Sequence, residues 1–210
     1  MTTHENKLWN LGYKHIVGVD EVGRGPWAGP LVVAGVILPI NYNNPLIRDS
    51  KQMSAKALEV AYRQIINDCI SYAIVTIPSH EIDLLNIKVA TKQAMTKVIE
   101  TLEVIPDYAL IDFEKLNLQI PSLSLIKGDS LSISIASASI VAKVTRDNIM
   151  HNLDQKFPAY SFSKHKGYGT RLHYQSLLIH GLCAEHRLSY KPIQKVQQLW
   201  IKNLHKDKLL

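Results

Sequence analysis

The sequence contains little cysteine, few aromatic residues and no long apolar run, and these scarcities exclude several classes of protein. Among 210 residues, only Cys69 and Cys183 are cysteines, and they lie far apart in unrelated contexts. Neither a disulfide framework nor a cysteine-based zinc site is therefore expected. The longest apolar run, LVVAGVILPI, is too short to cross a bilayer, and the segment MTTHENKLWNLGYKH lacks the apolar region of a signal peptide. The sequence thus predicts a cytoplasmic protein without a membrane partner.

What is present is the composition of an ordinary globular protein with a basic surplus. Hydrophobic residues make up 46% of the chain and charged residues 20%, and the length suits one domain. The formal net charge is +6, which favours a polyanionic partner such as nucleic acid. Many proteins are basic for no specific reason, so the charge supports this partner only in combination with a site.

Hydrophobic patterning predicts an α/β fold. Apolar runs rich in β-branched residues predict strands at His15–Asp20, Leu31–Leu38, Cys69–Ile77, Tyr108–Asp112 and Ser122–Ile126. Helices are expected at Ala55–Asn67, at His80–Leu102, near Arg171–Ile179 and around Ile193–Leu204. The segment Ser130–Leu153 begins like a strand, but its Ala/Ser-rich middle favours a helix packed closely on a sheet. A mixed five-stranded sheet flanked by helices, with a helical C-terminal extension, follows.

Acidic residues recur where the predicted strands end. Asp20 and Glu21 close the first strand, Asp112 closes YALID, and Asp129 follows the fifth strand in IKGDS. Strand ends are where ligand-binding residues gather in such folds, and carboxylates gathered there repel one another unless cations lie between them. Ligand sets made only of oxygen suit Mg²⁺ or Mn²⁺. The acids therefore predict a divalent-metal site.

A glycine-rich loop follows the first two acids. Neighbouring residues in a strand face opposite sides, so Asp20 and Glu21 share a site only if the backbone leaves strand geometry there. Gly23 and Gly25 would ease that departure and expose N–H groups to a phosphate or a sugar hydroxyl, and Arg24 adds guanidinium donors. Metal ions beside such a loop indicate phosphodiester chemistry, in which two ions about 3.5–4 Å apart activate water and stabilise the leaving oxygen.

Each of these residues taken singly also has a structural interpretation. Asp129 suits a helix N-cap, and Asp112 suits an isolated loop acid. A dinucleotide-binding enzyme or phosphotransferase using the glycine loop is an alternative, but a β-branched apolar run follows that loop where such a fold needs a helix. It is the combination of acids, glycines and basic charge that favours a nuclease.

Five sequence blocks, in order, resemble bacterial ribonuclease HII, the type 2 ribonuclease H. They are VDEVGRGPWAGPLVVAGVIL, DSKQMSAK, LNIKVATKQAM, KGDS with SIASASIVAKVTRD, and HKGYGT with HR further on. Together they span roughly Val17 to Arg187. The type 3 relative carries an extra N-terminal substrate-binding domain, whereas about fifteen residues precede the first predicted strand here, which favours type 2.

The resemblance implies one ribonuclease H type 2 domain over residues 1–210, with an α/β core of about 15–155 and a helical extension of about 156–210. It implies a monomeric endonuclease that hydrolyses the RNA strand of RNA–DNA hybrids. It also implies cleavage 5′ of single ribonucleotides in duplex DNA, leaving 3′-hydroxyl and 5′-phosphate ends. The expected cofactor is Mn²⁺ or Mg²⁺.

The resemblance also assigns site residues. Asp20, Glu21, Asp112 and Asp129 are the implied catalytic and metal-binding acids. Gly23, Arg24 and Gly25 would contact the 2′-hydroxyl and phosphate of the ribonucleotide, and Tyr168 would stack on the next sugar. Further phosphate contacts are expected from basic residues, namely Lys127, Lys143, Arg146, His165 and Lys166. His186 and Arg187 are expected to be structural.

Two departures from the family pattern leave alternatives open. Phe113 follows Asp112 where the family usually has glycine, and Glu114 comes next as a possible competing ligand. A nucleic-acid-binding module of this fold that has lost catalysis is therefore a second hypothesis. In the tail, Gln197, Leu199 and Trp200 faintly resemble a sliding-clamp peptide, but an ordinary amphipathic terminal helix is the preferred interpretation.

Overall fold

The structure, a computed structural model, describes residues 1–206, with side chains described as far as Ile201. Its contacts divide the chain into two compact units. The first unit comprises Met1–Val22, Val32–Thr76 and Thr91–Thr145, and the second comprises Gly23–Leu31, Ile77–Ala90 and the chain from Arg146 onward. The sequence interpretation of one domain with a core of about 15–155 and an extension of about 156–210 stays a prediction.

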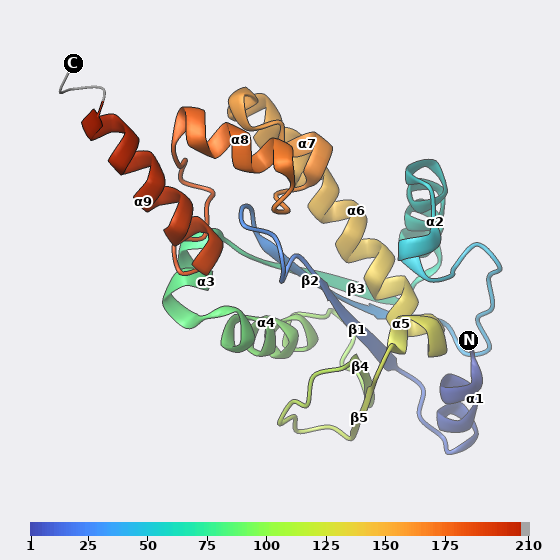
Figure 1. The fold of residues 1–210 in the computed structure, drawn as a ribbon. Helices are drawn as coiled ribbons and strands as arrows, with labels where there is room; N and C mark the ends of the chain where they lie inside the picture. Colours follow the sequence, from blue (N-terminus) through green and yellow to red (C-terminus); the bar gives the residue numbers. More distant parts are fainter. Residues whose placement is uncertain (207–210) are drawn as a thin grey trace. The chain divides into compact units, whose positions relative to one another are not determined.

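A mixed five-stranded sheet forms the centre of the first unit (Figure 1). Its strands are β1 (Ile16–Val22), β2 (Leu31–Ile37), β3 (Ser71–Ile77), β4 (Tyr108–Asp112) and β5 (Ser122–Leu125). They lie in the order β3-β2-β1-β4-β5. The central strand β1 pairs antiparallel with β2 and parallel with β4, and β4 pairs parallel with β5. Every residue of β2 is buried, as expected of a strand covered on both faces.

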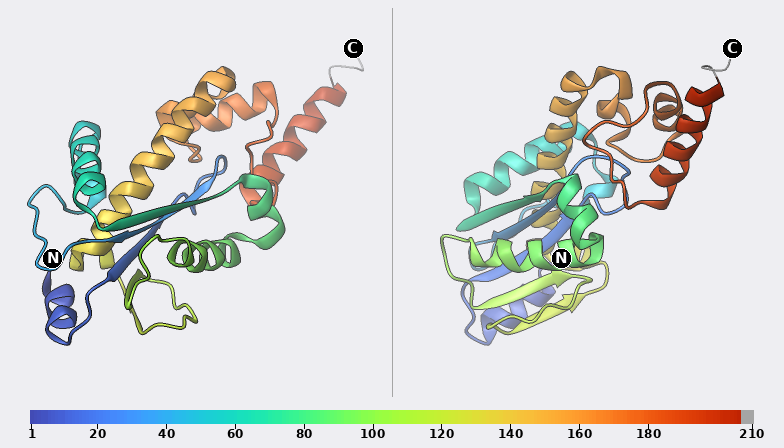
Figure 2. Two further views of the ribbon diagram at one scale, coloured as in Figure 1. Left: turned by 180° about the vertical axis from the view of Figure 1, so that it is seen from behind. Right: turned by 90° about the vertical axis from the view of Figure 1, so that its left-hand side faces the viewer.

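Helices of the first unit cover both faces of this sheet (Figure 1). The helices before the last strand are α1 (Thr3–Asn10), α2 (Ala55–Asp68), α3 (Ser79–Leu85) and α4 (Ile87–Glu100). Those after it are α5 (Gly128–Leu131), α6 (Ile133–Lys156), α7 (Phe162–His165), α8 (Arg171–His180) and α9 (Lys191–Lys206). Within the first unit, α2 and the beginning of α6 lie on one face and α4 on the other (Figures 1 and 2).

Glycine in β1 allows α6 to approach the sheet closely. A Cβ on Gly18 would lie 2.1 Å from the backbone carbon of Ser134, so no larger residue fits there. On the opposite face, Gly35 of β2 meets Val98 of α4 at an ordinary 3.4 Å. These contacts identify which face of the sheet each residue of β1 occupies.

The second unit contains most of the C-terminal helices and has an apolar core of its own. Ala28, Met150, Phe162, Leu177 and Ile193 are all fully buried in it. The C-terminal region is mostly helical, and the α/β fold with a mixed five-stranded sheet is confirmed. Within residues 1–206, no helix has the length and apolar character needed to cross a membrane.

Two helices differ from the sequence interpretation. The single helix expected at His80–Leu102 is two helices, because Asn86 has φ 62° and its side chain accepts hydrogen bonds from the N–H groups of Lys88 and Val89. The helix favoured for Ser130–Leu153 is confirmed, in α5 and α6. Helix α1 was not expected, since its few apolar residues give little periodic signal.

Candidate active site

Two of the predicted acids lie on the same face of the sheet. Asp20 of β1 pairs with Ala34 of β2. Gly18, two residues before Asp20, contacts α6, so the Asp20 side chain lies on the face of the sheet that α6 covers. Gly18 is also level with Leu110 of β4, and Asp112, two residues beyond Leu110, therefore faces α6 as well. The ends of β1 and β4 thus bring the Asp20 and Asp112 carboxylates to one face of one sheet.

Asp129 joins this group through a tight turn after β5. Lys127, in the left-handed region at φ 58°, turns the chain into α5, and the N–H of Gly128 donates to Asp112 Oδ1 at 2.7 Å. A Cβ on Gly128 would lie 3.2 Å from that oxygen and 2.6 Å from Ile135. The absence of a side chain at Gly128 therefore allows the segment carrying Asp129 to lie against Asp112.

Glu21 differs from the other three acids. Strand β1 stays in register with β2 through Glu21 and Val22, so the expected departure from strand geometry does not occur. The pleat directs Glu21 to the face opposite Asp20, although its N–H donates to Asp20 Oδ1 at 2.7 Å. The structure therefore brings Asp20, Asp112 and Asp129 to one face and places Glu21 at the edge of the group.

The electrostatics of this group favour a bound cation. Burial raises the pKa of Asp20 well above its usual range, and the charges of Glu21 and Asp112 raise it further. Burial likewise raises the pKa of Asp112, against the opposing effect of the Gly128 hydrogen bond. A buried carboxylate beside like charges is costly to ionise, and a positive charge placed among these oxygens would relieve that cost.

A cation from the chain already occupies part of this position. Lys51 Nζ lies 2.7 Å from Asp129 Oδ2, and this hydrogen bond raises the pKa of Lys51. Within the described residues, no three acidic, histidine or cysteine side chains are gathered as a ready-made metal cage. The donors are carboxylate oxygens, the ligands that Mg²⁺ and Mn²⁺ prefer, and the Lys51 ammonium shows that the site accepts positive charge. The residues therefore fit a hard divalent cation.

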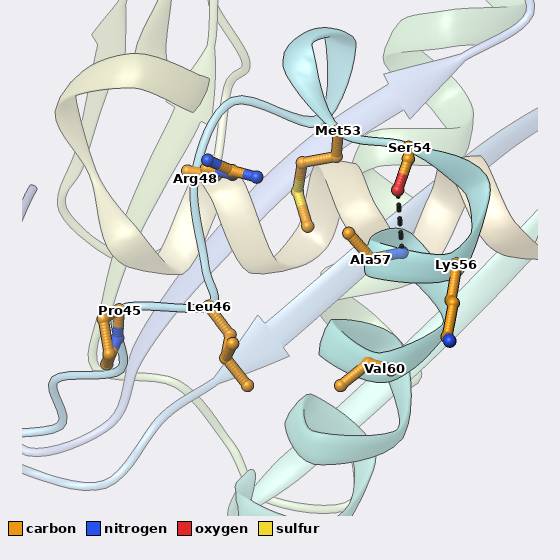
Figure 3. A pocket seen from close by; sticks show the side chains of 8 residues that line it. All are labelled: Pro45, Leu46, Arg48, Met53, Ser54, Lys56, Ala57 and Val60. Carbon is orange, nitrogen blue, oxygen red and sulfur yellow. Dashed lines mark hydrogen bonds between the residues drawn. The ribbon is translucent and has the colours of Figure 1, made fainter.

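A separate hollow of about 460 Å³ lies on the same stretch of chain as Lys51 (Figure 3). Its wall combines apolar side chains such as Leu46, Met53 and Val60 with Arg48 and Lys56. The Ala57 N–H donates to Ser54 Oγ at 3.3 Å and thereby caps the first turn of α2. Because no acid lines this hollow, it does not supply metal ligands.

In the second unit, the glycine loop is fixed by two buried arginines. The Arg187 guanidinium donates to the carbonyls of Gly23, Arg24 and Gly29. Arg146 donates to the carbonyls of Ala28, Pro30 and Lys166. Since the carbonyls of this loop accept these bonds, its shape does not depend on a ligand.

The predicted substrate residue Tyr168 lies beside this loop. The position that a Cβ on Gly25 would occupy is 3.7 Å from the Tyr168 ring, and the N–H of Trp27 donates to the Gly167 carbonyl at 2.8 Å. Tyr168 is half exposed. The second unit therefore brings Gly25 and Tyr168 together with their surfaces available.

Buried histidines hold the backbone at Tyr168. The N–H of Cys183 donates to His186 Nδ1 at 2.9 Å, so that nitrogen is the acceptor and His186 Nε2 carries the proton. His186 Nε2 then donates to His173 Nε2 at 3.0 Å, and His173 Nδ1 donates to the Tyr168 carbonyl at 3.0 Å. The His165 and His173 rings stack with centroids 4.5 Å apart.

Two of the expected phosphate contacts are wrong. Arg146 is 1% exposed and its donors are directed at backbone carbonyls, while His165 is buried between the Tyr160 carbonyl and the Gly167 N–H. The structural roles expected of His186 and Arg187 are confirmed. Lys51 is a site residue that the sequence interpretation missed, although it lies in the quoted block DSKQMSAK.

Comparison with known proteins decides the family. Residues 17–193 match the family model described as ribonuclease HII. The chain belongs to the ribonuclease HII family. Ribonuclease HII of Bacillus mycoides (strain KBAB4) is 46% identical over 198 residues, which cover 94% of this chain and 77% of the relative. Ribonuclease HII of Halalkalibacterium halodurans is 45% identical over 195 residues, covering 93% of this chain and 74% of the relative. The expectation of a ribonuclease H enzyme is thereby confirmed.

Solved structures of more distant proteins share the fold. Ribonuclease H2 from Pyrococcus horikoshii aligns with a TM-score of 0.78 at 22% identity, over 90% of this chain and 99% of that one. Ribonuclease HII of Archaeoglobus fulgidus, solved in complex with PCNA, gives 0.70 at 23% identity, over 84% and 95%. Bst-RNase HIII in complex with Mn²⁺ gives 0.67 at 17% identity, over 92% and 72%.

Proposed function

We propose that this ribonuclease H, which acts on RNA–DNA hybrids, also cuts duplex DNA on the 5′ side of a single embedded ribonucleotide. The products would carry 3′-hydroxyl and 5′-phosphate ends. The observation that carries the proposal is the placement of the Asp20 and Asp112 carboxylates on one face of the sheet, with Asp129 in the adjoining turn paired to the Lys51 ammonium. Family membership supplies the reaction class.

The acids Asp20, Asp112 and Asp129 would hold divalent cations, with Glu21 at the edge of the site. Mn²⁺ is bound by the related Bst-RNase HIII, and Mn²⁺ or Mg²⁺ suits an all-oxygen ligand set. Two such ions, held by these acids, would supply activation of the attacking water and stabilisation of the leaving oxygen. The protein's own part is to keep Asp112 oriented by the Gly128 N–H and to fix Asp129 in the adjoining helix.

The second unit would recognise the ribonucleotide. Gly23, Arg24 and Gly25 form a loop whose backbone can approach a sugar closely, and Tyr168 presents a half-exposed ring beside Gly25. The 2′-hydroxyl is the group by which a protein distinguishes RNA from DNA. Because Arg187 and the buried histidines fix the backbone on both sides of this surface, little reorganisation is needed when the substrate binds.

The test uses wild-type protein and three labelled duplexes: an RNA–DNA hybrid, a DNA duplex with one internal ribonucleotide, and an all-DNA control. Each is incubated with Mg²⁺, Mn²⁺ or EDTA, and the product ends are mapped at single-nucleotide resolution. The proposal requires one metal-dependent cut 5′ of the ribonucleotide and no cut in all-DNA. Cleavage of the hybrid alone would show that the enzyme does not act on single ribonucleotides.

Other predictions from the sequence remain open to test. A catalytically inactive binding module is disfavoured because all four acids are present, and the Glu114 carboxylate lies 3.8 Å from Lys92 Nζ, where it forms an ion pair. A monomeric state and a cytoplasmic location stay predictions.

The archaeal relative was solved in complex with PCNA. In this chain the residues suggested as a clamp peptide, Gln197, Leu199 and Trp200, lie in the amphipathic helix α9.

A further inference from the structure

The turn immediately after Asp112 has unusual backbone geometry. The N–H of Glu114 donates to the carbonyl of Asp112 at 2.6 Å, two residues back, and Phe113 between them has φ 56°. A three-residue turn of this kind with a positive central φ is rare and strained. Phe113 is further fixed by its N–H, which donates to the Leu125 carbonyl at the end of β5 at 2.9 Å.

The residue at the centre of this turn is poorly suited to it. Positive φ is tolerated by glycine, whereas for a bulky side chain it is a true outlier. The Phe113 ring gains little from burial in return, because the residue is 61% exposed, compared with 48% for Tyr168. Strained residues of this kind cluster at functional sites, and Phe113 directly follows a candidate metal-binding acid.

The chain that continues from Phe113 lines a basic groove. A hollow of about 640 Å³ lies between α4 and this loop, with Lys92, Lys97 and Lys115 in its wall and Glu100 as an acid there. Lys92 Nζ lies 3.8 Å from the Glu114 carboxylate and donates to the Lys115 carbonyl at 3.1 Å. Lys97 and Lys115 are exposed, so the groove presents net positive charge, and Phe113, with its exposed ring, precedes Lys115 by two residues in the chain. Positive charge together with exposed aromatic rings is typical of surfaces that bind a nucleic-acid strand.

We propose that Phe113 contacts the substrate: its ring packs on the sugar or base of a nucleotide next to the scissile phosphodiester. That strand then passes the end of β4 from the face of the acids to the α4 face and continues along the groove of Lys97 and Lys115. This inference rests on the proposed function, which places the scissile bond at the acids. It adds a substrate contact on the first unit to the one assigned to Tyr168 on the second. Strain at Phe113 is then maintained for binding and not for stability.

Photo-crosslinking tests the contact without requiring catalysis. A DNA duplex with one ribonucleotide carries 5-iodouracil at each position flanking the ribonucleotide in turn, is bound to the full chain in EDTA, and is irradiated. Peptide mass spectrometry then maps the linked residue. A crosslink at Phe113 from at least one position, absent in Phe113→Leu, is expected. Absence of a Phe113 crosslink from every position overturns the inference.

Kinetics provide the second readout. Phe113→Leu keeps an apolar side chain and the strained backbone at this position but removes the ring, so KM for the single-ribonucleotide duplex should rise about tenfold with kcat little changed. Phe113→Gly should raise KM similarly without lowering the melting temperature, because glycine suits the positive φ. Asn41→Gly, at another exposed residue with positive φ (63°), is the matched control and should change neither value.

The outcomes separate this inference from the function on which it rests. Wild-type protein that cuts at the ribonucleotide, with unchanged KM in Phe113→Leu, overturns the role of Phe113 and leaves the proposed function intact. Wild-type protein that cuts neither the hybrid nor the ribonucleotide duplex contradicts the proposed function, and the inference fails with it. A lower melting temperature in Phe113→Gly would assign the ring to folding and would also overturn the inference.

Discussion

At the scale of single residues, the clearest feature is a buried carboxylate placed among like charges. Asp20 is 4% exposed, and burial with the neighbouring charges of Glu21 and Asp112 raises its pKa. A group in this position lowers the stability of the metal-free protein and becomes favourable when a cation binds. Asp20 is thus a residue at which stability and function are expected to oppose each other.

Replacing Asp20 by Asn should stabilise the metal-free protein by about 1 kcal/mol, because the amide removes the buried charge and can still accept the Glu21 N–H. Wild type should show a rise in melting temperature on addition of Mn²⁺, and the same change should abolish it. Thermal unfolding in EDTA and in Mn²⁺ measures both effects. Glu103→Gln, at an exposed acid, should behave as wild type. A lower melting temperature of Asp20→Asn in EDTA would contradict this view of the site.

Residue by residue, the sequence was informative where chemistry and strand position coincide. Asp112 could be found because it is the last residue of a clearly apolar strand, β4, whose predicted bounds match the structure. Arg146 could not be assigned, because a guanidinium that donates to buried carbonyls and one that binds phosphate look alike in sequence. Lys51 was missed because its pairing with Asp129 joins residues 78 positions apart.

At the scale of elements, the N-terminal helix α1 caps the start of α6. Glu5 is fully buried, and its Oε1 accepts hydrogen bonds from the Ser132 hydroxyl and from the Ser134 N–H. A carboxylate at a helix N-terminus satisfies unpaired N–H groups and interacts favourably with the helix dipole. Helix α6 in turn carries Ser139, which hydrogen-bonds Asp20.

Glu5→Ala should therefore lower the free energy of unfolding by about 2 kcal/mol, since it leaves buried donors at the start of α6 without an acceptor. Urea unfolding at neutral pH measures the change. Glu103→Ala, which removes an exposed carboxylate, should alter stability by less than about 0.5 kcal/mol. Equal stabilities for Glu5→Ala and Glu103→Ala would show that the cap contributes nothing.

The helix break at Asn86 shows how an element boundary was misjudged. Apolar residues continue at helical spacing across His80–Leu102, so periodicity alone predicts one helix. Asn86 interrupts it because asparagine tolerates positive φ and caps the next helix with its side chain. Asn86 can be recognised in the sequence as a possible N-cap. The apolar periodicity continues on both sides of it, however, and this stronger signal favours one uninterrupted helix. Helix α1 lacked such a signal, and its burial comes from Glu5 and Leu8.

Two buried histidines, His173 in α8 and His186 after it, predict that the stability of the protein depends on pH. Burial lowers the pKa of His173 and that of His186 to about 4, whereas an unfolded histidine titrates near pH 6.5. Between these values the unfolded chain binds protons that the folded chain does not, so the free energy of unfolding falls as pH is lowered. The stability that neutral histidines provide is fully present above about pH 6.5 and is lost toward pH 4.

Urea unfolding at pH 7 and at pH 5 should therefore differ by about 2 kcal/mol or more, with the lower stability at pH 5. The change of an exposed histidine in the same unit, His151→Gln, should leave this difference unaltered. His186→Asn should lower stability at pH 7 and reduce the difference between the two pH values. Equal stability of the wild type at pH 7 and pH 5 would show that these histidines are not held neutral.

At the scale of the whole molecule, the acids and the substrate loop belong to different compact units that the chain joins between Val22 and Gly23. The first unit supplies carboxylates at strand ends, and the second supplies a glycine loop fixed by Arg187 together with Tyr168. Strand ends and glycine clusters leave a local signal, which indicated the acids and the glycine loop, whereas Tyr168 was implied only by the resemblance to the family. The sequence did not predict the division into units, which depends on contacts between distant segments.

We propose that this arrangement of acids performs metal-dependent cleavage at a ribonucleotide. The most direct measurement compares wild type with Asp112→Asn on a labelled DNA duplex carrying one ribonucleotide, in Mn²⁺, in Mg²⁺ and in EDTA, with hybrid binding measured in parallel. We expect a single metal-dependent cut 5′ of the ribonucleotide in wild type and its loss in Asp112→Asn, which should still bind the hybrid. Cleavage by Asp112→Asn at the wild-type rate would show that Asp112 is not needed for catalysis. Hybrid binding by wild type without any cleavage would show that these acids do not form an active site.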